Sequence, residues 1–338
     1  MPKSEKDPGP PGSPWPMLLA SASAGMVARV TCHPLDTCKA ILQVQAKNKC
    51  GAGAINSCVY SNFLQVIKGT VKKEGLAGLY RGFGVAFVGG APGLCLYLSA
   101  YEKTKAGLNS RYEFFEKYPA ASHFVSGMVA EAFSCVLFVP VDIAKERLQI
   151  QGPSNGAFVG GPKYQGNVDA VRQIWKLEGI RGVYKGYGAT LMSFGPFSAF
   201  YFVFYEQMKK KSLQLRGVDS VDDLPFFQHM ANSVFAGMAA SFVTNPLDLV
   251  KLRLQVQRGG NAVPSGAKGV SGLPWGAPYR NLFHGLGQIV KVEGAPALFK
   301  GVGARMAFHG PATAISMACY ESFQTYFKPI FEAKQSDE

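Results

Sequence analysis

The chain has 338 residues, of which 47% are hydrophobic and only 17% are charged; 39 are glycine, and the formal net charge is +13. This composition argues against two ordinary soluble domains and favours packed membrane helices. The seven cysteines have neither the paired spacing of a zinc site nor the density of a disulfide scaffold, so we expect them to be mostly reduced. The net charge fits either nucleic-acid binding or basic membrane loops, and the distribution of the basic residues along the chain has to distinguish these two interpretations.

At the start of the chain, residues 1–14 are rich in Pro and Gly and carry both signs of charge. They predict a disordered N-terminal tail rather than a signal peptide. Further along, three stretches without charged residues are long enough to cross a hydrocarbon core: Phe83–Tyr101, Tyr187–Tyr205 and Phe226–Leu247. Mean hydropathy is nevertheless barely positive. This low value indicates helices that surround a water-filled cavity with a polar lining.

A repeated pattern organises the chain. Blocks of the form Pro-x-Asp-x-x-Lys-x-x-x-Gln begin 106 residues apart, at Pro34, Pro140 and Pro246. Each block is followed by Glu-Gly, by an aromatic-basic-Gly triplet ending at Gly82, Gly186 or Gly301, and then by Tyr-Glu. The glutamate of Tyr-Glu always comes twenty residues after the glycine of the triplet, which is enough helix to span about 30 Å. Three copies of one structural unit are therefore present.

Each unit predicts a helix that ends in the proline block, a polar loop with a short helix, and a second spanning helix. We expect an all-α membrane protein with six transmembrane helices in three tandem repeats, pseudo-threefold symmetry and both termini on one side. The predicted boundaries are 15–110 for repeat 1, 119–212 for repeat 2, 225–328 for repeat 3 and 329–338 for a C-terminal tail.

The charges of the loops orient these helices. The loops within the repeats, 46–82, 152–186 and 258–301, hold 16 Lys and Arg against 4 Asp and Glu. The tails and the segments between repeats, 1–14, 102–118, 206–224 and 321–338, hold 12 against 13. The positive-inside rule therefore places the loops within the repeats on the inner side.

This triplicate pattern, Pro-x-acid-x-x-base followed by acid-Gly and aromatic-basic-Gly, resembles the signature of the mitochondrial carrier family along nearly the whole chain. The resemblance implies a monomeric, multi-pass transporter of a small organic metabolite in the mitochondrial inner membrane. The basic loops and short helices would then lie in the matrix, and both termini would lie toward the intermembrane space. No cofactor is implied. Structural cardiolipin would bind at the basic triplets and helix ends, although the triplets could instead serve only to start helices.

The resemblance also implies a matrix gate. The Asp and Lys of each block are neighbours on one helical face, and the family pattern pairs each acid with a base of another repeat: Asp36 with Lys145, Asp142 with Lys251, and Asp248 with Lys39. Gln43, Gln149 and Gln255 would brace these pairs by hydrogen bonds. The alternative is a permanently closed ionic plug, which the small net energy of partly hydrated pairs disfavours.

A second, cytosolic gate is implied by the sets Tyr101, Glu102 and Lys105; Tyr205, Glu206 and Lys209; and Tyr320, Glu321 and Gln324. Because Gln324 stands where the pattern has a base, Glu102 could pair with Lys209 and Glu321 with Lys105, while Glu206 would meet a neutral amide. We therefore predict a cytosolic gate weaker than the matrix gate, with alternating access between them. Snorkelling charges at helix ends are the alternative.

Substrate contacts are implied near the middle of the membrane, at Gly89, Gly90, Ser193, Phe194, Phe308 and His309, a mostly neutral set. Charge at this depth comes from Arg29 and Glu131. Two of the odd-numbered helices carry small residues four positions apart, Ser21 with Gly25 and Ser233 with Gly237, whereas in the third helix Gly127 is followed at this spacing by Glu131. We expect Arg29 to bind a carboxylate or phosphate and Glu131 an amino group or a proton, unless the two residues pair with each other.

Alternatives of other kinds remain. Intramembrane histidines (His33, His123, His229, His309) resemble features of mitoferrins, so iron carriage is an alternative; the fixed charge of Arg29 disfavours it, and we expect no resident metal site. The basic residues are spread over the loops, so we expect no nucleic-acid partner. An enzyme is disfavoured because the sequence lacks a metal-ligand cluster, a nucleophile elbow and a phosphate loop. A non-transporting membrane adaptor would not need a complete matrix ring.

Overall fold

The computed structural model describes residues 15–44, 60, 62–151, 164–218, 224–257 and 278–336, and the described elements are helices. Long helical segments follow one another along the chain: α1 (Trp15–Val44), α3 (Phe83–Arg111), α5 (Pro119–Ile150), α7 (Tyr187–Arg216), the pair α8 (Phe226–Val243) and α9 (Asn245–Val256), and α11 (Val302–Ser336). The predicted all-α fold is confirmed. The predicted tail 1–14 lies outside the described residues.

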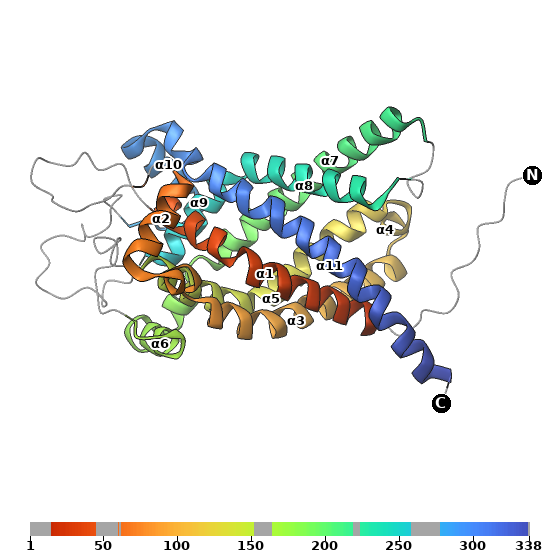
Figure 1. Ribbon diagram of the computed structural model, residues 1–338, viewed down its shortest axis with the longest axis horizontal. Helices are drawn as coiled ribbons and strands as arrows, with labels where there is room; N and C mark the ends of the chain where they lie inside the picture. Colours follow the sequence, from red (N-terminus) through yellow and green to blue (C-terminus); the bar gives the residue numbers. More distant parts are fainter. Residues whose placement is uncertain are drawn as a thin grey trace, which may run out of the picture.

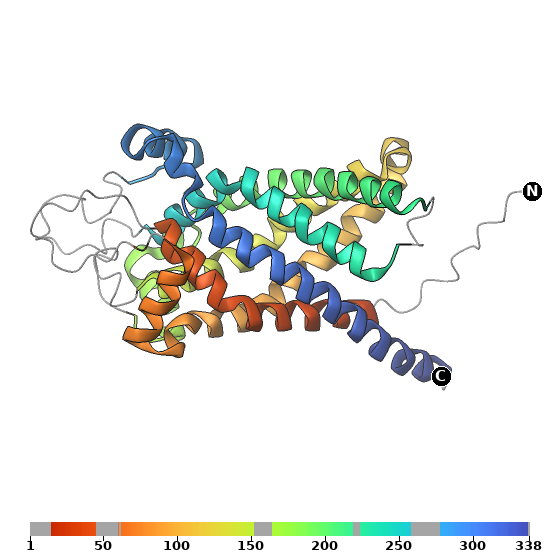
Figure 2. The same cartoon turned by 45° about the horizontal axis from the view of Figure 1, so that its top comes forward.

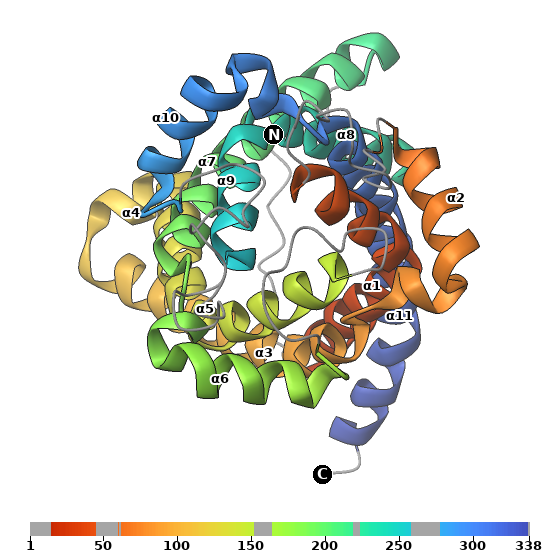
Figure 3. The same cartoon turned by 90° about the vertical axis from the view of Figure 1, so that its left-hand side faces the viewer.

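The long segments form a closed ring around a central axis (Figure 3). Going around it, α1 packs on α3, α3 on α5, α5 on α7, α7 on α8, and α8 on α11, which returns to α1. The short helices α2 (Phe63–Glu74), α6 (Asn167–Val183) and α10 (Leu282–Glu293) lie on the outside of the ring at one end (Figures 1 and 3). The start of α1, the end of α11 and α4 (Glu113–Lys117) lie at the opposite end, as the rotated view in Figure 2 also shows.

Membrane-spanning character is unevenly distributed over these helices. The segment Ala121–Ile150 of α5 is long and apolar enough to cross a membrane by itself. The bent pairs Leu76–Gly90 with Pro92–Arg111, and Phe226–Val243 with Asn245–Val256, also qualify when each pair counts as one span. The other long helices of the described part fall below this criterion. A low mean hydropathy is expected of helices that form a ring and have polar inner faces.

The repeated prolines differ in their effect. Pro34 and Pro140 lie inside the continuous helices α1 and α5, whereas the third helix breaks beside Pro246, between α8 and α9. The bend there is 67°. A proline removes one main-chain hydrogen bond and its ring clashes with the preceding turn, which accounts for the change of direction between α8 and α9.

The glycines of the repeated triplets have a structural reason. Gly82, Gly186 and Gly301 have φ angles of 73°, 84° and 74°, a left-handed conformation that favours glycine. They also lie against the proline-block helix of the next repeat: a Cβ on Gly82 would come within 2.9 Å of the Lys145 carbonyl oxygen. Gly82 and Gly186 directly precede α3 and α7. The triplets therefore start helices and hold neighbouring repeats in close contact.

Two fully buried arginines link the blocks to the short helices. Arg147 forms an ion pair with Glu178, and Arg253 forms one with Glu293; each acid belongs to the Glu-Gly pair of the same repeat. Each arginine Nε also donates to a main-chain carbonyl in the block of the next repeat, at 3.0 and 3.1 Å. Both guanidinium groups are thereby paired and hydrogen-bonded, as a buried charge requires.

In repeat 1 the glutamate of the Glu-Gly pair has a different basic partner. Ile41 occupies the position that corresponds to the buried arginines, and Glu74 forms an ion pair with Arg81 of the adjacent triplet. The acid of the Glu-Gly pair is thus neutralised in all three repeats, although the base comes from a different element in the first.

Side-chain clamps also hold the chain that leads into α6 and α10. Gln151 exchanges two hydrogen bonds with the main chain of Tyr164, at 2.7 and 3.0 Å, and Gln257 does the same with Tyr279, at 3.2 and 2.8 Å. Burial raises the pKa of the Tyr279 phenol above its ordinary value. Outside the bundle, the main-chain amide of Gln165 donates to Asp169 and holds the pKa of that carboxyl below its ordinary value.

Candidate functional site: a charged cavity closed by three ion pairs

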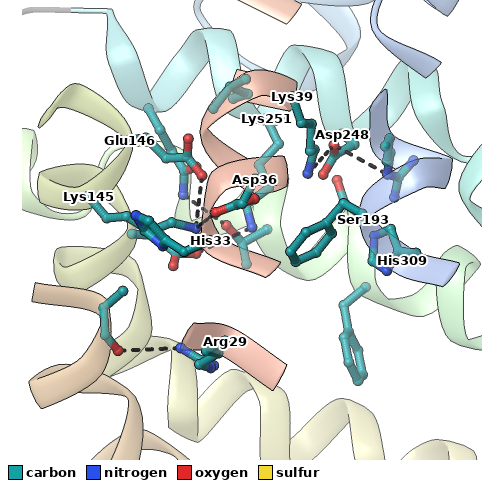
Figure 4. A pocket seen from close by; sticks show the side chains of 18 of the residues that line it. Arg29, His33, Asp36, Lys39, Lys145, Glu146, Ser193, Asp248, Lys251 and His309 are labelled. Atoms are coloured by element: carbon teal, nitrogen blue, oxygen red, sulfur yellow. Dashed lines mark hydrogen bonds and ion pairs between the residues drawn. The ribbon is translucent and has the colours of Figure 1, made fainter. Parts of the chain in front are cut away.

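A cavity of about 320 Å³ lies inside the ring of helices. Its lining comes from α1, α3, α5, α7, α9 and α11, so all three repeats contribute to it. The charged residues of the three proline blocks gather in one part of it (Figure 4). Enclosed cavities with a few convergent polar groups are the usual setting for small-molecule binding.

The three expected ion pairs of the proline blocks are present. Lys145 Nζ lies 2.5 Å from Asp36 Oδ2, Lys39 Nζ lies 2.9 Å from Asp248 Oδ2, and Lys251 Nζ lies 3.5 Å from Asp142 Oδ2. Each pair joins two different repeats, so together they close a ring across the bundle. These are the three pairings that the resemblance to the family implies.

Glutamines brace two of these pairs. Gln149 Nε2 donates to Asp36 Oδ2 at 3.2 Å and to Thr37 Oγ1 at 3.2 Å. Gln43 Nε2 donates to Asp248 Oδ2 at 3.2 Å and, more weakly, to Asn245 Oδ1 at 3.4 Å. In both cases an amide donor satisfies a carboxylate oxygen that also binds a lysine, which strengthens the pair.

The third predicted brace is wrong for this conformation. Gln255 Nε2 points to Thr190 Oγ1 on α7, at 3.5 Å, instead of to the Asp142–Lys251 pair. That pair is also the longest of the three and the most exposed, with 30% of the Asp142 side chain and 21% of the Lys251 side chain accessible. The ring therefore has two short, braced pairs and one loose pair.

Arg305 and Glu146 add charge to the ring without following the threefold pattern. Arg305 Nε lies 3.3 Å from Asp248 Oδ2, and its Nη1 donates to the Ser241 carbonyl at 2.8 Å. Glu146 Oε1 lies 3.6 Å from Lys145 Nζ. The repeat pattern does not reveal these residues, because the positions that correspond to Glu146 carry alanine and leucine in the other two blocks.

Arg29 and Glu131 both line the cavity, but they do not form an ion pair with each other among the described contacts. Arg29 Nη1 makes one weak hydrogen bond, to the Ala86 carbonyl at 3.4 Å, and lies apart from the ion pairs in Figure 4. Glu131 Oε1 accepts from the Cys135 thiol at 3.4 Å. Every other charged residue of the lining takes part in an ion pair of the ring.

The neutral positions expected to contact substrate fall into two groups. Ser193, Phe194, Phe308 and His309 line the cavity. Gly89 and Gly90 are not among the lining residues; Gly90 lies beside Arg29, where a Cβ would be 2.9 Å from Nη1. A glycine there leaves room for the guanidinium group against α3.

Phe197 is a lining residue that the sequence reasoning missed. The centre of its ring is 5.7 Å from Cζ of the Arg305 guanidinium group and 5.3 Å from the centre of the His309 ring. It is found one helical turn after Ser193, on the same face of α7, which was the only signal for it in the sequence.

At the opposite end of the bundle, the expected cytosolic pairing is not the one present. Lys209 Nζ lies 2.6 Å from Glu206 on its own helix, and Glu102 is exposed without an ion pair among the described side chains. The side chains of Glu321 and Gln324 lie outside the described part of the chain. The described conformation therefore has its ion-pair ring formed at the end that carries the short helices.

The aromatic residues of the same motifs have other partners. The Tyr101 hydroxyl forms a hydrogen bond with His123 Nδ1, and the Tyr205 hydroxyl forms one with His229 Nδ1 at 3.4 Å. Tyr320 is partly buried. The two histidines thus bind tyrosines of the predicted gate, and no group of three His, Cys, Asp or Glu side chains suited to a metal ion occurs within the described residues.

Comparison with known families identifies the family to which this chain belongs. A family model described as mitochondrial carrier protein matches the chain three times, at residues 10–112, 116–215 and 222–330. The chain belongs to the mitochondrial carrier family. Members of this family are transporters and not enzymes, so this chain is a transporter of a mitochondrial membrane.

Several relatives match this carrier over more than nine-tenths of its length. Mitochondrial substrate carrier family protein E of Dictyostelium discoideum is 32% identical over 313 residues, which covers 93% of this chain and 96% of the relative. Mitoferrin of the same organism is 30% identical, covering 93% and 94%. The mitochondrial carnitine/acylcarnitine carrier protein of Mus musculus is 32% identical, covering 94% and 95%. Relatives at this similarity differ in what their names say they carry, so the family alone leaves the substrate open.

Proposed function

We propose that this carrier moves a small organic metabolite that bears a carboxylate or phosphate together with an amino group, an amino-acid-like or nucleotide-like compound. The observation that supports this proposal is that Arg29 and Glu131 are the charges of the lining without an ion pair among the described contacts. A fixed cation binds an anionic group, and a fixed carboxylate binds an ammonium group. A substrate with both groups would neutralise both side chains.

Transport follows from two gates that alternate. The ring of Asp36, Asp142, Asp248 and their lysines is the matrix gate in this proposal, and the glutamates and lysines at the outer ends of α3, α7 and α11 are the cytosolic gate. Substrate binding offsets the free energy of breaking one ring while the other forms. The cytosolic gate is the weaker one, because Gln324 supplies no base.

The setting of the carrier is the inner membrane. We place α2, α6 and α10 in the matrix, because the loops that contain them are basic, and both termini toward the intermembrane space. Cardiolipin would meet the basic triplets at the starts of the even-numbered membrane helices. The carrier acts as a monomer, since one chain closes the ring of helices around the charged cavity.

Iron is the second candidate substrate, because a mitoferrin is among the relatives that match the full length. The cavity argues against it. Arg29 would repel a cation, and the described residues contain no cluster of three metal-binding side chains.

The test combines a thermal-shift screen of the purified carrier against a metabolite library with uptake of the hits into liposomes. A bound ligand raises the unfolding temperature. We expect Arg29→Gln and Glu131→Gln to abolish both the shift and the uptake, while the controls Arg172→Gln and Glu113→Gln, at exposed positions outside the cavity, retain them. Uptake at the wild-type rate by either cavity variant would remove that residue from the site.

The same liposomes separate a carrier from a non-transporting adaptor. Neutralising Asp142 or Lys251 should stop exchange in a carrier, because each change breaks a pair of the gate. An adaptor would show no exchange in the wild-type protein for any metabolite of the screen.

A further inference from the structure

A second cavity, of about 700 Å³, lies between α3, α5 and α7, beyond the charged one. It is more than twice as large, and its walls are mainly apolar and aromatic, including Tyr97, Leu98, Phe124, Met128 and Phe202. Its charged and imidazole groups are Glu206 and His123. His123 is hydrogen-bonded to Tyr101, and Glu206 is paired with Lys209, so these polar groups already have partners.

The two cavities meet at an aromatic contact. Phe194 lines both of them. The ring of Tyr97 approaches the ring of Phe194 edge-on, with centroids 6.5 Å apart. Since α5 stands between α3 and α7 in the ring of helices, this contact crosses the interior of the bundle. It forms a boundary between a charged and an apolar compartment.

One face of α5 connects the compartments. Gly127 lines the apolar cavity and Glu131, one helical turn later, lines the charged one. A Cβ on Gly127 would lie 3.7 Å from the Tyr97 hydroxyl oxygen, so the absent side chain lets the tyrosine rest against α5. A ligand group bound at Glu131 would therefore lie next to the Tyr97–Phe194 boundary.

We infer that the second cavity is an apolar subsite of the transport site, and that the substrate is an amphipathic amino acid or related zwitterion. Its charged groups lie against Arg29 and Glu131, and its alkyl or aromatic side chain extends past Tyr97 and Phe194 into the space between α3, α5 and α7. This inference rests on the proposed function, because it assigns the charged end of the substrate to the same two residues.

The test is a homologous series of α-amino acids that share the same α-carboxylate and α-ammonium groups and differ in the apolar side chain: alanine, norvaline, norleucine and 2-aminooctanoate, with phenylalanine as the aromatic member. Affinity is measured for the purified carrier by thermal shift, and inhibition is measured in liposome uptake. Each methylene buried in an apolar site is expected to raise the affinity about fourfold. A plateau marks the length at which the cavity is filled.

Variants that fill the cavity provide the control. Ala199→Phe and Ser198→Phe place a ring at two positions that line the apolar cavity and not the charged one. They should leave the affinity for alanine within about twofold and remove the gain with chain length. Ser99→Phe, at an exposed position of α3 that lines neither cavity, should behave as wild type.

The outcomes separate this inference from the proposed function. If alanine binds and depends on Arg29 and Glu131, but longer side chains give no gain, the apolar subsite is wrong and the proposed function stands. If the gain persists in both filled variants, the side chain binds elsewhere and the inference is wrong. If no amino acid of the series binds, the zwitterion assignment itself fails, and the inference fails with it.

Discussion

The unequal ion pairs that join the three proline blocks lead to a specific prediction about Lys145 and Lys251. Lys145→Gln removes the base from the 2.5 Å pair and leaves Asp36, whose side chain is 9% exposed, without its cation. Breaking a buried pair costs roughly 3–5 kcal/mol. The hydrogen bond from Gln149 remains, so we expect a loss of about 3 kcal/mol in the free energy of unfolding. Lys251→Gln breaks the loose 3.5 Å pair, whose acid is 30% exposed, and should cost about 1 kcal/mol or less.

Buried thiols report unfolding in this experiment. Cys32, Cys38 and Cys135 are almost fully buried, so a thiol-reactive fluorophore labels them when the purified carrier unfolds on heating. Lys145→Gln should lower the unfolding temperature clearly more than Lys251→Gln, and Lys176→Gln, on the exposed face of α6, should leave it unchanged. Equal losses for the two ring variants, or a larger loss for Lys251→Gln, would refute the ranking of the pairs.

Further predictions concern the contacts that support the ring. Glu178→Gln leaves its buried arginine partner unpaired and should cost about 3 kcal/mol in thermal unfolding. Asp169→Asn, on the solvated surface of the same helix, is the control and should cost far less. Gly186→Ala forces a Cβ into a left-handed φ of 84° and within 3.1 Å of a neighbouring side chain, which should cost about 1–2 kcal/mol; Gly188→Ala, with nothing within 4 Å, should be neutral. Gln149→Leu removes a hydrogen bond to a buried carboxylate and should cost about 1.5–3 kcal/mol. If Glu178→Gln, Gly186→Ala or Gln149→Leu unfolds at the wild-type temperature, the contact that this variant changes does not stabilise the carrier.

The sequence predicts the ring well because symmetry constrains it. Three blocks with the same internal spacing place their acids and bases at equivalent depths, so neighbouring repeats can pair whatever the detailed shape of the loops. Symmetry brings the acids and bases to one level, and the resemblance to the family implies the direction of pairing seen in Asp36–Lys145 and Asp248–Lys39. The repeated glycines follow in the same way, since a left-handed φ in one repeat recurs in the others.

Departures from symmetry are harder to predict from the pattern. Gln255 bonds to Thr190, a residue of α7 outside the repeated motif, so the pattern could not anticipate it. Arg305 reaches Asp248 from α11 and lies outside the proline blocks, so the repeated pattern does not predict this contact. Whether Arg29 pairs with Glu131 depends on the rotation of α1 against α5, which the sequence does not specify.

The cytosolic pairs illustrate a further limit. The sequence indicates which residues could pair in some conformation, whereas the proposed alternating access would form one ring at a time. In the described conformation Lys209 binds Glu206 of its own helix. The pairing of Glu102 with Lys209 stays a prediction for the opposite conformation.

The most direct test of the account is a charge exchange between Asp36 and Lys145 in liposome transport of a metabolite identified by the thermal-shift screen. Asp36→Lys and Lys145→Asp each place two like charges side by side in the matrix ring, so each single variant should lose transport. The double variant restores an opposite pair and should regain a measurable part of the wild-type rate. Single variants that transport at the wild-type rate, or a folded double variant that remains as inactive as the singles, would contradict a matrix gate made by this ion pair.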